Sequence, residues 1–235
     1  MKKIIPIIIS ILITGCSPSY YVPNSQNIPI MKSKGQANFG IGIKQSEYTA
    51  SYEFQGAYAI TNHVAMQLNA DLIYSADIES KGNMLEIGAG YYKKIAPDFV
   101  FETYGLLYFG NLKIKDISTQ NNYNDFSADI IRLGIQPSLS YNRKYFTASI
   151  STRLANLNYY NINGNYYNDE YDINYLKRNN SYRLIEPALT LQTGFKDIKL
   201  QLQYVYSYNL TDPSFEQELN IISLGLKFNI DPKKK

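Results

Sequence analysis

Large apolar side chains alternate with small or polar ones along about ten successive segments of this chain, each nine to eleven residues long. No charged residue falls on the apolar parity in any of these segments. A period of two residues is that of a β-strand whose two faces meet different environments. The pattern therefore predicts an all-β fold of about ten strands, with apolar parities over 37–43, 52–58, 64–74, 85–91, 99–109, 131–141, 146–154, 185–195, 198–208 and 222–228.

The opposite parity of the same segments carries acids and bases in near balance, together with several glutamines. Such a face suits the inside of a narrow closed barrel, because carboxylates and cations can pair there and amides fill the remaining hydrogen bonds. The apolar face would then meet lipid. The charged residues expected inside the barrel are Glu53, Asp71, Glu86, Glu102, Arg132, Arg153, Glu186, Lys199 and Lys227.

Alternation alone does not decide between this arrangement and a soluble barrel that encloses an apolar ligand, because the same pattern serves both. The connections favour the membrane barrel, since short and long ones alternate along the chain, as in outer-membrane barrels with tight periplasmic turns and long external loops. Tight turns are expected near 61–63, 93–98, 142–144 and 196–197, and longer loops near 75–83, 111–125, 155–182 and 209–220.

Two prolines interrupt the alternation. Pro137 and Pro187 fall inside predicted strands, on the parity assigned to lipid. Proline has no backbone N–H to donate to a neighbouring strand, so each predicts a bulge or a local break in the sheet.

The last predicted strand carries Ser223, Gly225, Phe228 and Ile230 at spacings that resemble the C-terminal assembly signal of outer-membrane barrels. The chain departs from that signal by continuing through a short basic tail, 231–235. With the strand pattern, the resemblance is to uncharacterised outer-membrane β-barrel lipoproteins of Gram-negative bacteria. It implies a closed, antiparallel, up-and-down transmembrane β-barrel over 36–230, surrounded by outer-membrane lipid and inserted by the barrel-assembly machinery.

The N-terminus resembles a bacterial lipoprotein signal peptide. Lys2 and Lys3 precede an apolar stretch that is too short to span a bilayer as a helix, and Gly15 precedes the single cysteine, Cys16. The resemblance implies that 1–15 is removed and that Cys16 is lipidated. We expect 16–35 to be a periplasmic linker from the lipid to the barrel, with both termini in the periplasm.

The chain offers little catalytic chemistry. Its only histidine, His63, lies in a predicted tight turn, and it has no metal-spaced cysteines and no glycine-rich phosphate loop. No basic stripe interleaved with aromatic residues follows a nucleic-acid backbone. The sequence therefore predicts a protein that is not an enzyme and that binds no cofactor, metal or nucleic acid.

The segment 155–182 combines tyrosine with asparagine, a composition typical of adaptable recognition surfaces. It is expected either to contact a surface protein or glycan or to cover the barrel mouth passively. A structural or surface-interaction role is the preferred prediction, and a narrow pore and a periplasmic lipoprotein with an apolar ligand are the alternatives. The candidate recognition residues are Tyr159, Tyr160, Tyr166, Tyr167, Tyr171 and Tyr175.

Overall fold

The computed structural model describes residues 19–74, 81–116, 124–164, 173–195 and 197–231. Within these residues lie eleven strands and one short helix. They are β1 (Ala37–Gln45), β2 (Ala50–Ala59), β3 (Val64–Tyr74), β4 (Lys81–Ala96), β5 (Phe99–Asp116), β6 (Asn124–Asn142), β7 (Phe146–Gly164), α1 (Ile173–Arg178), β8 (Ser181–Gly194), β9 (Ile198–Tyr206), β10 (Tyr208–Asn209) and β11 (Asn220–Ile230).

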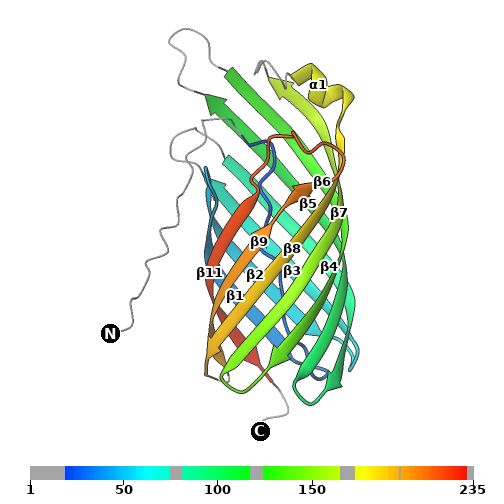
Figure 1. The fold of residues 1–235 in the computed structure, drawn as a ribbon, viewed down its shortest axis with the longest axis vertical. Helices are drawn as coiled ribbons and strands as arrows, with labels where there is room; N and C mark the ends of the chain where they lie inside the picture. Colours follow the sequence, from blue (N-terminus) through cyan, green and yellow to red (C-terminus); the bar gives the residue numbers. More distant parts are fainter. Residues whose placement is uncertain (1–18, 75–80, 117–123, 165–172, 196, 232–235) are drawn as a thin grey trace, which may run out of the picture.

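The strands form one closed antiparallel barrel (Figure 1). Consecutive strands from β1 to β9 pair with one another, β9 pairs with β11, and β1 closes the ring by pairing with β11 along its whole length. The two-residue β10 follows β9 and pairs with β8, so the ring contains ten strands, as the sequence predicts. Closure matters because it leaves no strand edge with unpaired backbone groups.

The apolar parity points outward around the barrel. Leu133 is 64% exposed and Ile150 is 61% exposed, and most of the other large apolar residues of the predicted parity are exposed as well. The polar parity points inward and is buried. The strands therefore carry apolar residues on the outside of the barrel and hydrogen-bonding residues on the inside, the reverse of a soluble protein.

Both prolines coincide with breaks in strand pairing. Residues of β6 pair with β7 up to Ile135 and again from Ser138, so the pairing skips Pro137. Pro187 on β8 stands where its pairing partner changes from β9 to β10. The missing N–H of each proline is thus placed where no ladder hydrogen bond is required.

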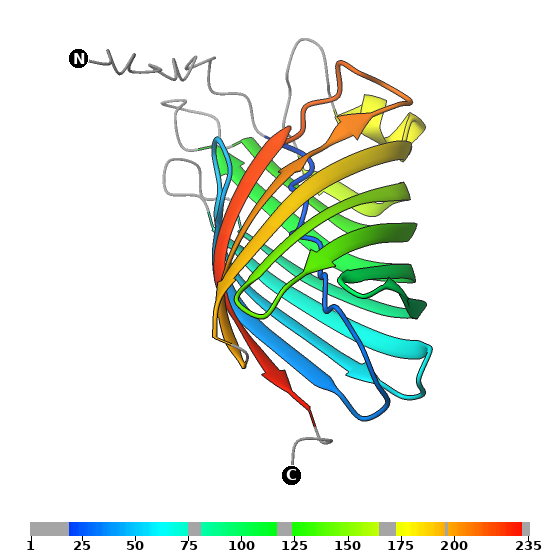
Figure 2. The same ribbon diagram turned by 60° about the horizontal axis from the view of Figure 1, so that its bottom comes forward.

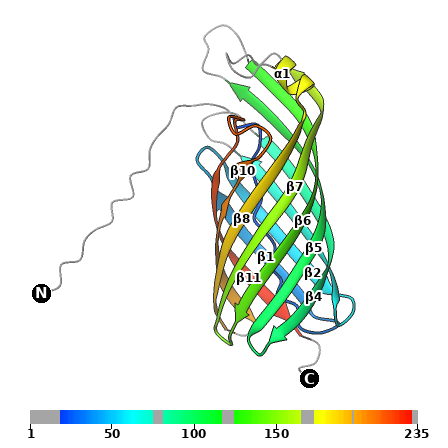
Figure 3. The ribbon, with the colours of Figure 1, turned by 45° about the vertical axis from the view of Figure 1, so that its right-hand side comes forward.

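Strands β5, β6 and β7 are longer than the sequence pattern predicts. They continue into the segments expected to be loops near 111–125 and 155–182, and together they rise beyond the rest of the barrel (Figure 3). Alternation persists there with its polarity reversed. On β5 the outward residue changes from Phe109 to Asn111, while Leu112 and Ile114 are buried inside. We call this region the emergent rim, defined as residues 81–84, 110–116, 124–130, 155–164 and 181–184.

The N-terminal part of the described chain lies inside the barrel. Every residue from 20 to 31 is buried, and the segment runs through the interior before the chain turns into β1 (Figure 2). We call residues 20–31 the lumenal segment. The structure thus differs from the expected linker over 16–35, because most of that stretch occupies the barrel interior, where it meets the hydrogen-bonding groups of the inward parity.

The two ends of the barrel differ in their connections. Short turns join β2 to β3, β4 to β5 and β6 to β7 at one end, where β11 also ends (Figure 1). The connections from β1 to β2 and from β10 to β11 lie at the other end, together with α1. We call these the turn end and the loop end.

Candidate functional site

The barrel interior gathers all nine of the charged residues that the sequence assigns to it. Each is at most 6% exposed. Each of the strands β2 to β9 and β11 contributes one of them. The inward parity therefore brings together residues that are far apart in the sequence. The nine are Glu53, Asp71, Glu86, Glu102, Arg132, Arg153, Glu186, Lys199 and Lys227.

Four of these charges form a closed cluster across β4, β6, β7 and β8. Arg132 Nη2 lies 2.6 Å from Glu86 Oε2, and Arg153 Nε lies 2.5 Å from Glu186 Oε2. Longer contacts complete the ring, 3.8 Å between Arg132 and Glu186 and 3.6 Å between Arg153 and Glu86. We call these residues the four-charge cluster. Their charges sum to zero, which is what allows such groups to be buried.

The lumenal segment supplies the remaining partners of this cluster. The Tyr21 hydroxyl donates to Glu186 Oε1 at 2.9 Å and accepts from Arg132. The Asn24 side-chain oxygen accepts from Arg132 Nη2 at 2.6 Å, and the Asn24 carbonyl accepts from Arg153 Nη2 at 3.0 Å. The segment therefore satisfies hydrogen bonds of buried charges that would otherwise need water.

Amide groups continue these contacts toward the turn end. The Gln26 backbone N–H donates to Gln203 Oε1 at 2.7 Å, and Gln203 Nε2 donates back to the Gln26 carbonyl at 2.9 Å. The Asn27 side chain donates to the Gly56 carbonyl at 3.0 Å, and its own carbonyl accepts from Gln136 Nε2 at 2.9 Å. Different parts of the ring thus hold neighbouring residues of the segment, β9 at Gln26 and both β2 and β6 at Asn27.

Two further charges bind the segment at its backbone. Both carboxylate oxygens of Glu102 accept backbone N–H groups, those of Ile30 at 2.9 Å and Met31 at 3.0 Å. Ile30 has a φ of 57°, in the left-handed region that a β-branched residue rarely adopts. Lys44 Nζ donates to the Pro23 carbonyl at 2.9 Å while it pairs with Asp71 at 2.6 Å. The buried carboxylate of Glu102 therefore holds the unfavourable backbone conformation of Ile30.

Aromatic and apolar residues replace charges where the interior reaches the emergent rim. Tyr20 packs edge-on against Phe126 at 5.0 Å and lies 6.0 Å from Phe215, centroid to centroid. The Tyr159 hydroxyl donates to the Tyr20 carbonyl at 2.8 Å, and Tyr182 stacks on Phe215 at 4.2 Å. The loop end is thus closed by packing, whereas the middle of the barrel is closed by ion pairs and hydrogen bonds.

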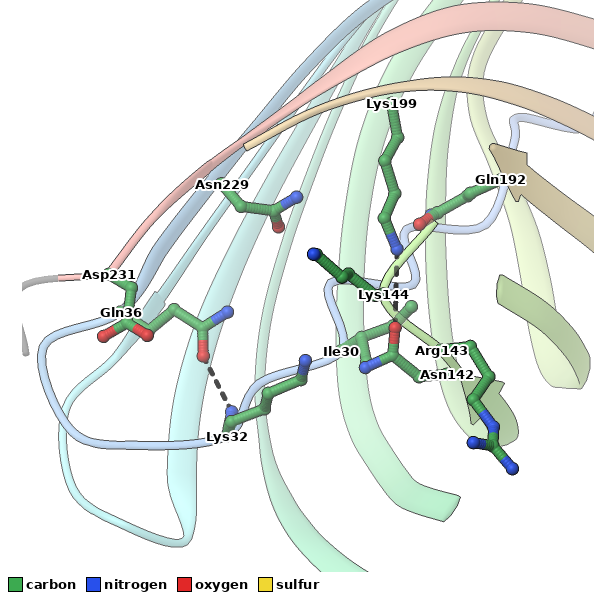
Figure 4. A pocket seen from close by; sticks show the side chains of 10 residues that line it. All are labelled: Ile30, Lys32, Gln36, Asn142, Arg143, Lys144, Gln192, Lys199, Asn229 and Asp231. Carbon is green, nitrogen blue, oxygen red and sulfur yellow. Dashed lines mark hydrogen bonds between the residues drawn. The ribbon is translucent and has the colours of Figure 1, made fainter. Parts of the chain in front are cut away.

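A small vestibule opens at the turn end (Figure 4). The cavity has a volume of about 390 Å³, and the Lys199 side chain hangs into it, with Nζ 2.7 Å from Thr147 Oγ1 and 3.4 Å from Asn142 Oδ1. Lys32, Lys144 and Asp231 also line it. Ile30 forms part of its wall, so the lumenal segment bounds the vestibule.

The structure divides the predicted recognition tyrosines. Tyr159 is buried in the rim, whereas Tyr160, one residue later on β7, is exposed. Tyr175 lies on α1, and its hydroxyl donates to Asp212 Oδ2 at 2.9 Å. The segment expected as one loop from 155 therefore begins as strand, and its packing withdraws Tyr159 from any external surface. Three of the tyrosines, Tyr166, Tyr167 and Tyr171, lie outside the described residues.

The predicted assembly signal lies on β11, at the strand pair that closes the barrel. Ser223 points inward and is buried, while Phe228 and Ile230 face outward opposite Phe39 and Ala37 of β1. Gly225 pairs with Gly42, and a Cβ at Gly225 would lie 2.8 Å from the Ile41 carbonyl oxygen, so this position admits only glycine without a shift. The lipidation candidate Cys16 and the signal 1–15 lie outside the described residues.

His63 is exposed in the turn between β2 and β3, where it stacks on Tyr91 at 5.7 Å. Among the described residues, no group of three or more histidine, cysteine, aspartate or glutamate side chains is placed to hold a metal ion. In the same part of the chain, no helix is both long and apolar enough to cross a bilayer.

The sequence reasoning missed the residues of the lumenal segment that bind the interior charges, chiefly Tyr21, Asn24, Gln26 and Asn27. A signal was present in the composition. No charged residue occurs between Cys16 and Lys32, and the stretch contains two tyrosines, one valine, one methionine, two isoleucines and three prolines. Such a stretch is a poor candidate for a solvated linker, since disordered linkers are poor in aromatic and β-branched residues.

No protein-family model matches this sequence. No characterised protein matches it either. Solved structures that resemble the fold include the N-terminal β-barrel domain of OprF from Pseudomonas aeruginosa, with 12% identity, a TM-score of 0.40, and coverage of 85% of this chain and 100% of that one. The NanC porin has 12% identity and a TM-score of 0.43, with 82% and 98% covered, and the KdgM porin has 10% and 0.43, with 83% and 99% covered.

Proposed function

We propose that this protein is a lipid-anchored outer-membrane barrel whose interior is permanently filled by its own N-terminal segment, and that it has a structural or surface-interaction role without catalysis. The outward surface supports the membrane environment. A closed ring of exposed Leu, Ile, Phe and Tyr side chains would be unfavourable in water, at roughly 25 cal/mol for each Å² of apolar surface, and it matches the lipid-facing band of membrane barrels.

The filled interior is the observation that carries the proposed role. A pore needs a continuous aqueous path, but residues 20–31 are buried along the axis and are hydrogen-bonded to strands on all sides. A carrier of apolar ligands needs an apolar cavity, but the middle of this barrel holds the four-charge cluster. Both alternatives therefore have weaker support than a closed barrel.

The emergent rim and α1 are the parts available for contact with a surface protein or glycan. Tyr160 is exposed on the rim, and α1 carries Lys177 and Arg178 in its last turn, also exposed. We propose that these groups, with the tyrosines of 166–171, form the contact surface. The residues Ser223, Gly225, Phe228 and Ile230 are proposed to serve recognition by the assembly machinery during insertion.

Two measurements on the full-length protein in detergent and in bilayers test this proposal. We expect folded, fast gel migration that becomes slow only after boiling, because the closed barrel resists detergent. In planar bilayers we expect no steady conductance. Release of the unlipidated protein into the soluble fraction would contradict the membrane barrel, and a steady open current would contradict the filled interior.

A matched pair of variants tests whether the lumenal segment is the plug that blocks conduction through the barrel. Replacing Asn24, Gln26 and Asn27 with glycine removes side chains that bind the wall of the barrel, and is expected to produce intermittent current if the segment is the plug. Replacing Asn161, Asn163 and Asn174 with glycine also removes three amide side chains, but at the loop end, and is expected to give no current in the bilayer. Equal behaviour of the two variants would contradict the assignment of the plug.

A further inference from the structure

The lumenal segment is tied at both mouths of the barrel. At the loop end, the Tyr20 N–H donates to the Glu216 carbonyl at 2.9 Å, and the Tyr21 carbonyl accepts from the Glu218 N–H at 2.9 Å. At the turn end, the Lys34 N–H donates to Asn62 Oδ1 at 3.1 Å, just before the chain enters β1. The chain therefore passes through the barrel from the loop end to the turn end (Figure 2).

The direction of passage separates the two termini. The last described residues follow β11 at the turn end, whereas the first described residue, Ser19, precedes Tyr20 at the loop end (Figure 1). Tyr20 packs on Phe126 and accepts from Tyr159, and both residues belong to the emergent rim. The segment thus leaves the barrel at the level where the outward surface has already become polar.

The segment cannot slide back through the barrel. Its contacts include the buried charges of the four-charge cluster and Glu102, and moving it by even one residue would break these hydrogen bonds together. Ile30 is held in a backbone conformation that depends on the Glu102 contacts. The position of Ser19 at the loop end is therefore fixed by the whole length of the segment.

Chain length limits how far Cys16 can lie from the loop end. Cys16 is three residue steps from Ser19, and at full extension these steps reach about 11 Å. The fourteen residues of β8 span about 46 Å at a rise of about 3.3 Å per residue. An attachment at Cys16 therefore cannot reach the turn end around the outside of the barrel.

We propose that the lipid on Cys16 inserts into the membrane leaflet at the loop end, which is the outer leaflet at the cell surface. The inference rests on the proposed function for the lipid itself and for the loop end being external. It reverses the expectation that both termini are periplasmic. The protein would then contact the outer leaflet in two ways, through the apolar outward surface of the barrel and through the acyl chains on Cys16.

The same geometry sets the order of assembly. A lipidated N-terminus does not pass through an interior filled with paired charges, so the barrel must close around the segment. The closing pair is β1 with β11, which joins the two ends of the sheet. Residues 20–31 are expected to lie in place before this pair forms.

Single thiols on intact cells test the proposal. Ser19→Cys reports the segment at the loop end, Lys34→Cys reports it at the turn end, and Lys177→Cys on α1 reports which side the loops face. A lipidated Cys16 has no free thiol, so each variant carries one. We expect a membrane-impermeant maleimide to label the Ser19→Cys and Lys177→Cys variants on intact cells, and to label Lys34→Cys only after lysis.

The ratio of labelling on intact cells to labelling after lysis corrects for partial burial, and heat-modifiable migration confirms that each variant folds. Labelling of Lys177→Cys without Ser19→Cys on intact cells would overturn the inference and leave the proposed orientation standing. Failure of Lys177→Cys to label would instead overturn the orientation. Mass measurement of the N-terminal peptide is expected to show acyl chains, and their absence would overturn the lipid anchor.

Discussion

The middle of the barrel and the emergent rim are built on the same strands with opposite polarity. On β6, the middle shows Leu133 and Ile135 outward and Arg132 and Gln136 inward, whereas the rim shows Asp129 outward and its apolar residues inward. Neighbouring strands reverse at corresponding positions, since Phe109 pairs with Ile131 and Asn111 pairs with Asp129. One sheet therefore crosses from a surface that suits lipid to one that suits water.

The difference shows how each region satisfies the same requirement of a closed interior. In the middle, the outward residues face hydrocarbon, so the interior holds polar and charged groups, for which burial is unfavourable unless they find partners. In the rim, the polar residues face outward toward water, and the interior is an aromatic core. The lumenal segment serves both, with Tyr20 packed in the rim and Asn24 bound to ion pairs below it.

The largest expected effect comes from opening the four-charge cluster. Glu186→Leu leaves Arg153 and Arg132 without one of their carboxylates in a buried site, and is expected to lower the free energy of unfolding by about 3–5 kcal/mol. Unfolding in urea, followed by heat-modifiable migration, measures it. The double variant Glu186→Leu with Arg153→Met removes one charge of each sign and is expected to recover much of the loss. Equal losses in both variants would contradict a cluster held by charge balance.

A charge on the outward surface locates the boundary between the two regions. Ile135→Arg places a cation in the apolar belt and is expected to cost about 2–4 kcal/mol of folding stability in bilayers. Ser127→Arg makes the same change on the same strand and parity, but in the rim, where about zero is expected. Refolding into lipid vesicles gives both values. Similar costs at the two positions would remove the boundary.

A single hydroxyl tests whether the rim holds the lumenal segment. Tyr159→Phe deletes the hydrogen bond to the Tyr20 carbonyl and is expected to lower stability by about 1 kcal/mol. Tyr160→Phe changes the adjacent exposed tyrosine and is expected to have no effect. Protease cleavage of the variants near residue 20 follows the loosening, and the rim would have no such role if both variants resisted cleavage alike.

The smallest effect is a pH dependence at the loop end. Burial raises the pKa of the Glu218 carboxyl, although the backbone N–H groups of Tyr48 and Glu47, which donate to it, act in the opposite direction. Because the folded pKa is raised, the contribution of Glu218 to stability is fully present below its ordinary pKa and is lost as the pH rises through the raised value. Glu218→Gln is therefore expected to gain stability relative to the parent over that range. A constant difference at all pH values would contradict this.

The alternation predicted the strands of the middle region well and stopped short in the rim. Segments such as 131–141 were found because their outward residues form an uninterrupted apolar series. On the N-terminal side of Ile131 the apolar residues change to the other parity, with Ile130, Ala128 and Phe126 inside. The parity that predicts the strand therefore carries only polar residues there. This inversion is the reason why the sequence predicts long loops near 111–125 and 155–182, where β5, β6 and β7 continue as strands.

The alternation of the strands does not predict which interior residues contact one another, because these contacts depend on how the barrel closes in space. Parity correctly placed Glu86 and Arg132 on the inward face, but their pairing requires side chains of β4 and β6 to meet across the intervening strand β5. For Tyr21 and Asn24 there was no parity to follow, because the segment has no period. Only the shape of the closed barrel reveals that these residues meet the cluster.

The sequence alone determined that the sheet has two unlike surfaces, because a strand repeats every two residues and each face must suit its surroundings. It also determined the number of strands, since each crossing leaves its own apolar series. The tertiary structure decided what fills the barrel and at which end the N-terminus leaves it. Those outcomes depend on hydrogen bonds between residues distant in the chain, such as Tyr21 with Glu186, and no local pattern records them.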